Sequence, residues 1–209
     1  MKSEKKYNQQ LLVAGNDDIH VIWALCEKFK VYQSFDVIDC KGISNIYEQI
    51  PTRLKQSEII TIGIIIDADT NLASRWTSLS DILNAQGYRI PIDLPESGLI
   101  LKQTENMDIG VWIMPNNNLN GMLEDFISFL VPNDDKLFPI VNTNLNNIES
   151  EKLNKYLLIH KSKAIIHSWL ALQEDPGTPM GLSITKKYLS TDEKNCFRFI
   201  DWINKLFNE

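Results

Sequence analysis

The chain has 209 residues, of which 44% are hydrophobic and 23% are charged, and its formal net charge at pH 7 is -6. This apolar fraction supports a packed core and excludes a chain that is disordered throughout. The acidic balance excludes a protein that coats nucleic acid with a uniformly basic surface. It does not exclude a nuclease in which a local basic face holds phosphate.

Cysteine content and hydropathy bear on the compartment. The three cysteines, Cys26, Cys40 and Cys196, are far apart, so no Cys-x-x-Cys pair or cysteine–histidine cluster offers a zinc site. An odd number of scattered cysteines is typical of a reducing cytoplasm. No run approaches the roughly 20 apolar residues of a membrane span. We therefore expect a cytoplasmic protein that does not contact a membrane.

The first part of the chain alternates between short apolar strands and amphipathic helices. The first helix begins near Asp17 or Asp18, either of which is a suitable N-cap. An alternation of this kind predicts right-handed crossovers and a parallel sheet with helices on both faces. The pattern predicts strands at residues 11–13, 35–40 and 59–66, followed by helices at 17–29, 42–55 and 72–86.

Turn-forming residues divide the second part of the chain. Loops rich in Pro, Gly or Asn at residues 89–98 and 115–121 enclose two more strands, at 99–101 and 109–114. The remainder predicts helices at residues 122–130, 150–173 and 192–207, a polar linker or loop at 142–147 and a turn at 174–179. The fold class is therefore α/β, with an α/β domain at residues 8–132 and a C-terminal helical extension at residues 148–209.

Asp67 and Asp69 follow the apolar strand that contains Ile64-Ile65-Ile66. Ligands of parallel α/β sheets bind beyond the carboxyl ends of the strands. Residues i and i+2 of a strand point the same way, so both carboxylates face one site if the extended backbone persists through Asp69. Such a pair suits Mg²⁺ or Mn²⁺. The alternative is structural: Asp67 ends the strand and Asp69 caps the next helix.

Four segments in this order resemble the Toprim domain, the metal-binding module of topoisomerases, primases and several nucleases. The likeness covers about residues 10 to 130 and is strongest to small standalone, nuclease-type Toprim proteins related to the OLD and ribonuclease M5 groups. The helical tail around 161–171 is also similar to the tails of such proteins. The segments are Val13–Asp18, Asp67–Asp69, Trp112–Asn116 and Gly121–Asp125.

The resemblance implies a Toprim-like parallel sheet and a role for each matching residue. Asp67 and Asp69 would hold Mg²⁺ or Mn²⁺, with Asp18 beside the metal. Glu124 and Asp125 would bind a second ion, and Lys163 would stabilise charge in the transition state. Each residue also has a structural reading: Asp18 as a helix cap, the acids at 124 and 125 as first-turn residues on a solvated face, and the lysine as an ordinary surface side chain.

Position 14 departs from the family pattern. Toprim domains carry a glutamate just before the glycine that ends the first strand, and this chain has Ala14 there. Alanine cannot bind metal or transfer a proton. Either the chain is a natural, impaired member, or the alanine is an engineered substitution that inactivates the site. The intact surroundings favour the second explanation, and we expect Ala14→Glu to create or restore metal-dependent cleavage.

Two functional hypotheses follow. The first is a metal-dependent endonuclease that cleaves DNA or RNA. The resemblance implies that it is the effector of a bacterial antiphage system and is paired with an ABC-type or AAA-type ATPase. The absence of a phosphate-binding loop from this chain is compatible with such a partner. The second is a non-catalytic binding or assembly subunit of such an ATPase complex. The apolar C-terminal helices predict either packing on the sheet or an interface with a second copy or a partner.

Overall fold

The computed structural model describes residues 7–103 and 106–209 and contains, within that part of the chain, a five-stranded sheet in the order β2-β1-β3-β5-β4. The first four strands in that order run parallel, and β4 is an antiparallel edge strand. The α/β fold predicted from the sequence is confirmed. The strands are β1 (Gln9–Val13), β2 (Asp36–Asp39), β3 (Thr61–Asp67), β4 (Leu99–Leu101) and β5 (Asp108–Met114).

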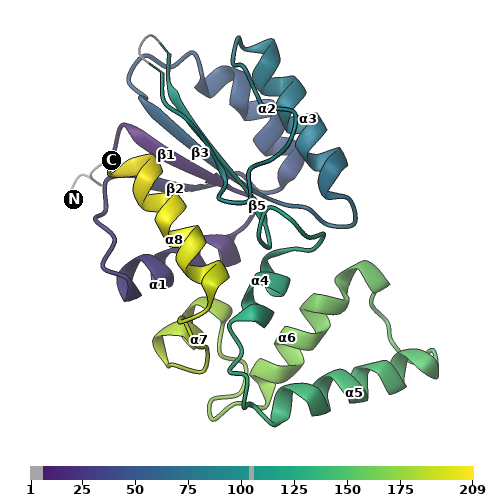
Figure 1. The fold of residues 1–209 in the computed structure, drawn as a ribbon. Helices are drawn as coiled ribbons and strands as arrows, with labels where there is room; N and C mark the ends of the chain where they lie inside the picture. Colours follow the sequence, from purple (N-terminus) through teal and green to yellow (C-terminus); the bar gives the residue numbers. More distant parts are fainter. Residues whose placement is uncertain (1–6, 104–105) are drawn as a thin grey trace.

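Helices cover both faces of the sheet (Figure 1). Side chains alternate along β3, so Ile64 and Ile66 enter the core beneath two helices, while Ile65 enters the core on the opposite face. The first pair of helices is α2 (Ile43–Arg53) and α3 (Leu72–Ala85), and the opposite face carries α1 (Asn16–Lys28) and α8 (Lys194–Phe207).

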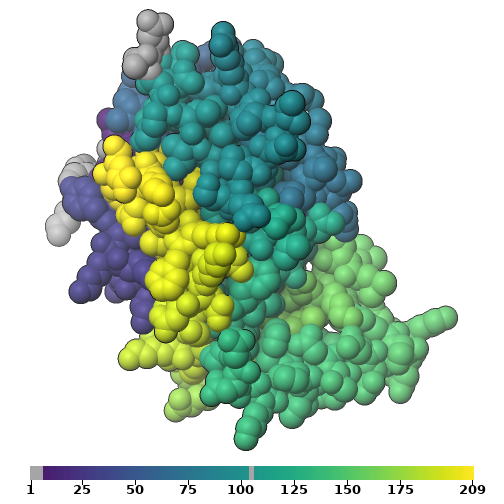
Figure 2. Space-filling model, viewed as in Figure 1, coloured from purple at the N-terminus to yellow at the C-terminus, as the bar shows by residue number. Residues whose placement is uncertain are grey.

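The C-terminal helix α8 packs directly on the strands. A side chain at Gly63 would lie 2.9 Å from Phe207 Cζ, and one at Gly110 would lie 2.3 Å from Leu206 Cδ2. The two glycines therefore provide the room for close helix–sheet contact. Figure 2 shows α8 in yellow on the surface, between the purple N-terminal segment and the teal middle of the chain.

The remaining helices lie beyond the carboxyl ends of the parallel strands. In Figure 1, α5 and α6 lie side by side away from the sheet, with α4 between them and the strands. The short helix α7 packs on α1, where Gly181 lets the two backbones approach closely. These elements are α4 (Leu123–Phe129), α5 (Leu137–Ser150), a 3₁₀ turn at Leu158–His160, α6 (Lys161–Ala171) and α7 (Met180–Thr185).

Two expectations for this region are wrong. Residues 142–147, expected to form a polar linker or loop, lie inside α5, because the i, i+4 pair Val141 and Leu145 buries one face of the helix. The single helix expected at 150–173 is interrupted. Lys152 adopts a left-handed conformation (φ 57°) that ends α5, and α6 begins only at Lys161.

The structure also bears on the cysteines and on the expected absence of a membrane span. Cys26, Cys40 and Cys196 are buried free thiols. In the part of the chain that the structure describes, no helix is both long enough and apolar enough to cross a membrane.

Candidate functional site

An acidic pocket lies at the carboxyl ends of β1 and β3, where α1 and α4 begin. Its volume is about 260 Å³. The loop between β1 and α1 forms one wall, Asp67 at the end of β3 forms the floor, and Lys163 reaches in from α6. We call this set of residues the acidic pocket: Ala14, Gly15, Asn16, Asp17, Asp18, Asp67, Leu123, Glu124 and Lys163.

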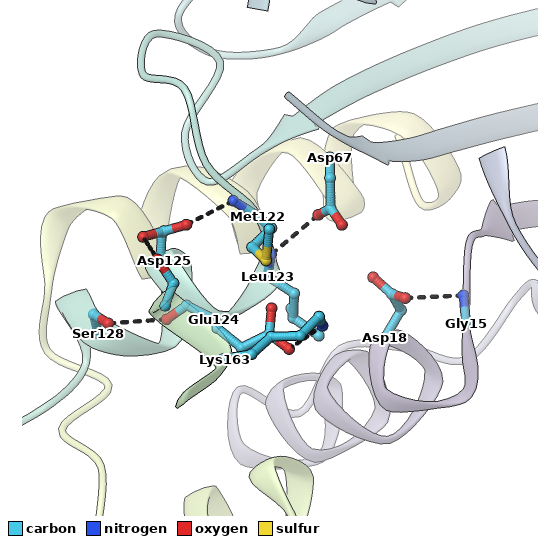
Figure 3. A network of polar contacts seen from close by, with 10 residues as sticks. Gly15, Asp18, Asp67, Met122, Leu123, Glu124, Asp125, Ser128 and Lys163 are labelled. Carbon is cyan, nitrogen blue, oxygen red and sulfur yellow. Dashed lines mark hydrogen bonds and ion pairs between the residues drawn. The ribbon is translucent and has the colours of Figure 1, made fainter. Parts of the chain in front are cut away.

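Asp18 is the third residue of α1, and its carboxylate faces the pocket (Figure 3). Its Oδ2 accepts a hydrogen bond of 3.0 Å from the Gly15 backbone N–H, so the side chain also closes the start of the helix. Burial raises the pKa of Asp18 from 3.8 to about 7; the Gly15 hydrogen bond opposes this rise and the nearby Glu124 adds to it. The reading of Asp18 as the N-cap is wrong in position, because Gly15 is the N-cap and Asp18 closes the capping box from the third residue of the helix, where it also lines the pocket.

Asp67 is held at the end of β3 by the start of α4. Its Oδ1 accepts a hydrogen bond of 3.0 Å from the Leu123 backbone N–H. Its pKa is raised from 3.8 to about 8, mainly by burial and also by the carboxylates of Asp18, Glu124 and Asp69, against the opposing effect of Lys163. Asp18 and Asp67 therefore share one poorly hydrated pocket, in which their negative charges would repel each other.

Glu124 is the most buried acid of the pocket. Its side chain is 1% exposed, and Oε1 forms an ion pair with Lys163 Nζ. Its second oxygen, Oε2, is buried without a hydrogen-bond partner. Burial lowers the pKa of Lys163, but the hydrogen bond and charge of Glu124, with Asp67 and Asp17, raise it overall, so the lysine is cationic. A buried carboxylate oxygen without a donor is the atom most in need of a cation or a proton.

Two other predicted metal ligands, Asp69 and Asp125, do not line the pocket. The backbone leaves the extended conformation at Asp69 (φ 50°), which exchanges two backbone hydrogen bonds of 2.8 Å with Gly121 and pairs with Arg75. The expectation that Asp67 and Asp69 face one site is therefore not met. Asp125 accepts hydrogen bonds from the Met122 backbone at 2.8 Å and from Ser162 Oγ at 2.5 Å.

Position 14 lies in the wall of the acidic pocket. It is the position that matches the glutamate of Toprim domains. Ala14 is partly exposed, and its backbone oxygen accepts a hydrogen bond of 2.7 Å from Gly42 N–H. A longer acidic side chain at this position would start from the same wall as Asp18. Besides the exposed Asp17, the pocket already holds the acids of Asp18, Asp67 and Glu124, and position 14 is where a further one would enter.

The donors of the acidic pocket fit a hard divalent cation in their chemistry, but they are not assembled around one. Three carboxylates converge, and Glu124 Oε2 has no partner. As the side chains stand, no group of three His, Cys, Asp or Glu residues in the described ranges 7–103 and 106–209 is close enough to hold an ion. Binding would require the acids to close up and Lys163 to move away from Glu124.

A larger cavity of about 630 Å³ lies at the opposite, amino-terminal ends of β3 and β5. Among its described lining residues it has one carboxylate, that of Asp108, which accepts a hydrogen bond from the Gln103 backbone and pairs with Lys102 at 3.3 Å. This cavity brings no acids together, so the chemistry of the molecule points to the smaller, acidic pocket.

Sequence reasoning missed two contacts that shape the pocket. Leu123 contributes its backbone N–H to Asp67, and Ser162 bonds Asp125 across 37 positions of sequence. No local pattern indicates either contact, because each depends on how α4 and α6 pack. The one sequence signal that pointed to this part of α6 was Lys163, a candidate site residue from the resemblance, which is next to Ser162.

Comparison with known proteins identifies a family. A family model described as "Protein of unknown function (DUF3226)" matches residues 8–208, which is nearly the whole chain. Neither the curated proteins nor the solved structures contain a match to this sequence. The chain belongs to the DUF3226 family.

Proposed function

We propose that this protein is a divalent-cation-dependent phosphodiesterase of the Toprim kind that acts on DNA or RNA. The observation that carries the proposal is the convergence of three carboxylates, of which that of Glu124 is buried, and one lysine at the carboxyl ends of parallel strands. Asp18, Asp67 and Glu124 would hold Mg²⁺ or Mn²⁺. When bound, the ion would stabilise negative charge on the scissile phosphate and lower the pKa of a water molecule.

Backbone hydrogen bonds hold two of the carboxylates in the pocket, and the ammonium of Lys163 is held by its ion pair with Glu124. Asp18 Oδ2 and Asp67 Oδ1 are each fixed by a backbone N–H, which orients the carboxylates toward the pocket (Figure 3). Their raised pKa values mean that, without a cation, a proton is shared among these acids near neutral pH. Lys163, freed from Glu124, would place its ammonium beside a phosphate oxygen.

The resemblance also supports a cellular context. A nuclease-type Toprim protein without a phosphate-binding loop fits a cytoplasmic effector of bacterial antiphage defence whose ABC-type or AAA-type ATPase partner senses infection. The acidic net charge of -6 supports a partner that supplies part of the basic surface for nucleic acid. A neighbouring gene for such an ATPase would be the simplest sign of this partnership.

A second candidate function is a non-catalytic binding subunit of an ATPase complex. Two observations favour it. Ala14 stands where Toprim domains carry a glutamate, and Lys163 already neutralises Glu124. In this case the pocket would be a charge-balanced structural element, and cleavage would be absent under all metal conditions.

Cleavage by the Ala14→Glu variant tests the two functions against each other. The added carboxylate should raise Mg²⁺- or Mn²⁺-dependent cleavage of plasmid DNA or cellular RNA by roughly tenfold or more, because it completes the donor set at the wall of the pocket. The measurement is product formation with Mg²⁺, Mn²⁺ or EDTA, with Ala14→Gln as the uncharged control of nearly equal size. A folded Ala14→Glu protein that cleaves neither nucleic acid would favour the binding subunit.

A further inference from the structure

Helix α6 contacts α4 through two consecutive residues, of which Lys163 lines the acidic pocket. Lys163 pairs with Glu124, and Ser162 donates a hydrogen bond of 2.5 Å to Asp125. Consecutive residues of α6 thus contact consecutive residues of α4. The rest of α6 is attached through buried side chains such as Ile166 and Trp169. The contact at Lys163 is therefore the one by which α6 reaches the pocket itself.

A neighbouring lysine of the same helix has a different environment. Lys161 Nζ lies 2.6 Å from Glu149 Oε2 and 2.7 Å from Asn146 Oδ1, both on α5. Its ion pair stays within the α5–α6 pair and does not reach the acidic pocket. Lys161 is therefore a matched control for Lys163.

The pocket requires positive charge, and Lys163 supplies it. Glu124 is 1% exposed, and burial of a carboxylate without a counter-charge is strongly unfavourable. The charge of Lys163 also acts on Asp18 and Asp67. Among the described residues that line the pocket, Lys163 is the only basic one. One ammonium thus acts on the charges of three carboxylates. It pairs with Oε1 of Glu124, and Oε2 of the same side chain has no partner.

The lysine can leave its position without crossing the core, provided that another cation balances Glu124. Its side chain is 45% exposed, so its ammonium can move into water without crossing the core. An ammonium is a single charge on a flexible four-carbon stem, whereas a divalent cation carries twice the charge and accepts several oxygen ligands at once. The two cations would compete for Glu124, because both need Oε1 or the space beside it.

We propose that Lys163 is a displaceable internal counter-ion, which balances the charge of Glu124 until a divalent cation takes its place. Its release detaches α6 from the pocket at that residue, while the Ser162–Asp125 hydrogen bond and the buried face of α6 keep the helix in place. Lys163 thereby sets the cation concentration at which the pocket fills. The inference rests on the proposed function in one respect, that the acidic pocket takes a divalent cation.

Titration with Mn²⁺ tests the competition directly. Lys163→Met keeps a side chain of similar length but removes the charge, and it should bind Mn²⁺ about tenfold more tightly than the unaltered protein, because a cation near the ion has been removed. Lys161→Met should bind Mn²⁺ as the unaltered protein does. Binding is measured by calorimetry or by the electron paramagnetic resonance signal of free Mn²⁺, after circular dichroism has shown that each variant is folded.

A second measurement needs no substitution and so does not depend on the folding of a variant. In the unaltered protein, trace acetic anhydride modifies lysine amines in proportion to their freedom from ion pairs, and mass spectrometry reads each site separately. Added Mn²⁺ should raise the labelling of Lys163 several-fold relative to Lys161, because only the former loses its carboxylate partner.

The outcomes separate this inference from the proposed function. Equal Mn²⁺ affinity in all three proteins, with labelling of Lys163 unchanged by Mn²⁺, would overturn the inference and leave the metal site in place. No Mn²⁺ binding by any of them would overturn both the inference and the proposed function. Tighter binding by Lys163→Met would support the inference, whereas an Ala14→Glu protein that keeps Lys163, binds Mn²⁺ and cleaves no nucleic acid would count against the proposed cleavage alone.

Discussion

Two ion pairs lie at the same edge of the sheet in different surroundings. In the Asp69–Arg75 pair both side chains are 28% exposed, so water reaches each partner. In the Glu124–Lys163 pair the acid is 1% exposed and the lysine 45%. An exposed pair contributes about 0–1 kcal/mol, whereas removing the partner of a buried charge leaves that charge uncompensated. The comparison teaches that burial of the acid, more than the pairing itself, marks the place where a cation would be stabilised most.

The largest expected effect concerns metal binding. Asp67→Asn should weaken Mn²⁺ affinity about a hundredfold, because it removes a charged ligand from the acidic pocket, and it should abolish cleavage by the Ala14→Glu variant. Asp69→Asn should weaken affinity by less than about tenfold, since its carboxylate is held by Arg75 outside the pocket. Calorimetric titration measures both. Equal losses would mean that Asp69 leaves Arg75 to join the ion.

A smaller effect is expected on stability in EDTA. Lys163→Met should lower the free energy of unfolding by about 1–3 kcal/mol, because Glu124 stays buried without its cation. Arg75→Met should lower it by less than about 1 kcal/mol, because Asp69 is hydrated. Urea denaturation of the two variants and the unaltered protein at one pH gives the comparison. A greater loss in Arg75→Met would reverse the order that burial predicts.

The smallest effect is the pH dependence of stability without metal. The pKa of Asp67 is raised from 3.8 to about 8, so between those values the folded chain keeps a proton that the unfolded chain releases. Raising the pH through this range therefore lowers the free energy of unfolding, by at most about 1.4 kcal/mol per pH unit for each such group. Asp67→Asn should flatten this decline, as should Asp18→Asn below about pH 7.

Urea denaturation at pH 5, 6, 7 and 8 in EDTA checks the sign and the slope. The decline belongs to the metal-free protein, because a bound cation would favour the ionised acids and oppose it. Stability that rises with pH across this range in the unaltered protein would show that the acidic pocket is better hydrated than its geometry indicates.

Much of the sheet could be predicted from local pattern. Apolar runs bounded by turn residues located all five strands to within a few residues, and the β-α alternation indicated parallel pairing. The resemblance placed Asp18 near Asp67, which agrees with the rule that the carboxyl ends of adjacent parallel strands meet at one edge. Helix α5 was missed, since its buried positions, Val141 and Leu145, are diluted by asparagines.

The sequence by itself therefore determined the order of the elements, the parallel sheet and the edge at which the acids gather, because periodicity and turn chemistry act over short distances. Tertiary structure alone decided which acids meet. The left-handed turn at Asp69 directs that residue to Arg75, and the packing of α6 on α4 brings Lys163 to Glu124, 39 positions away. Such pairings depend on how helices pack at the end of the sheet, and no local sequence signal specifies that packing.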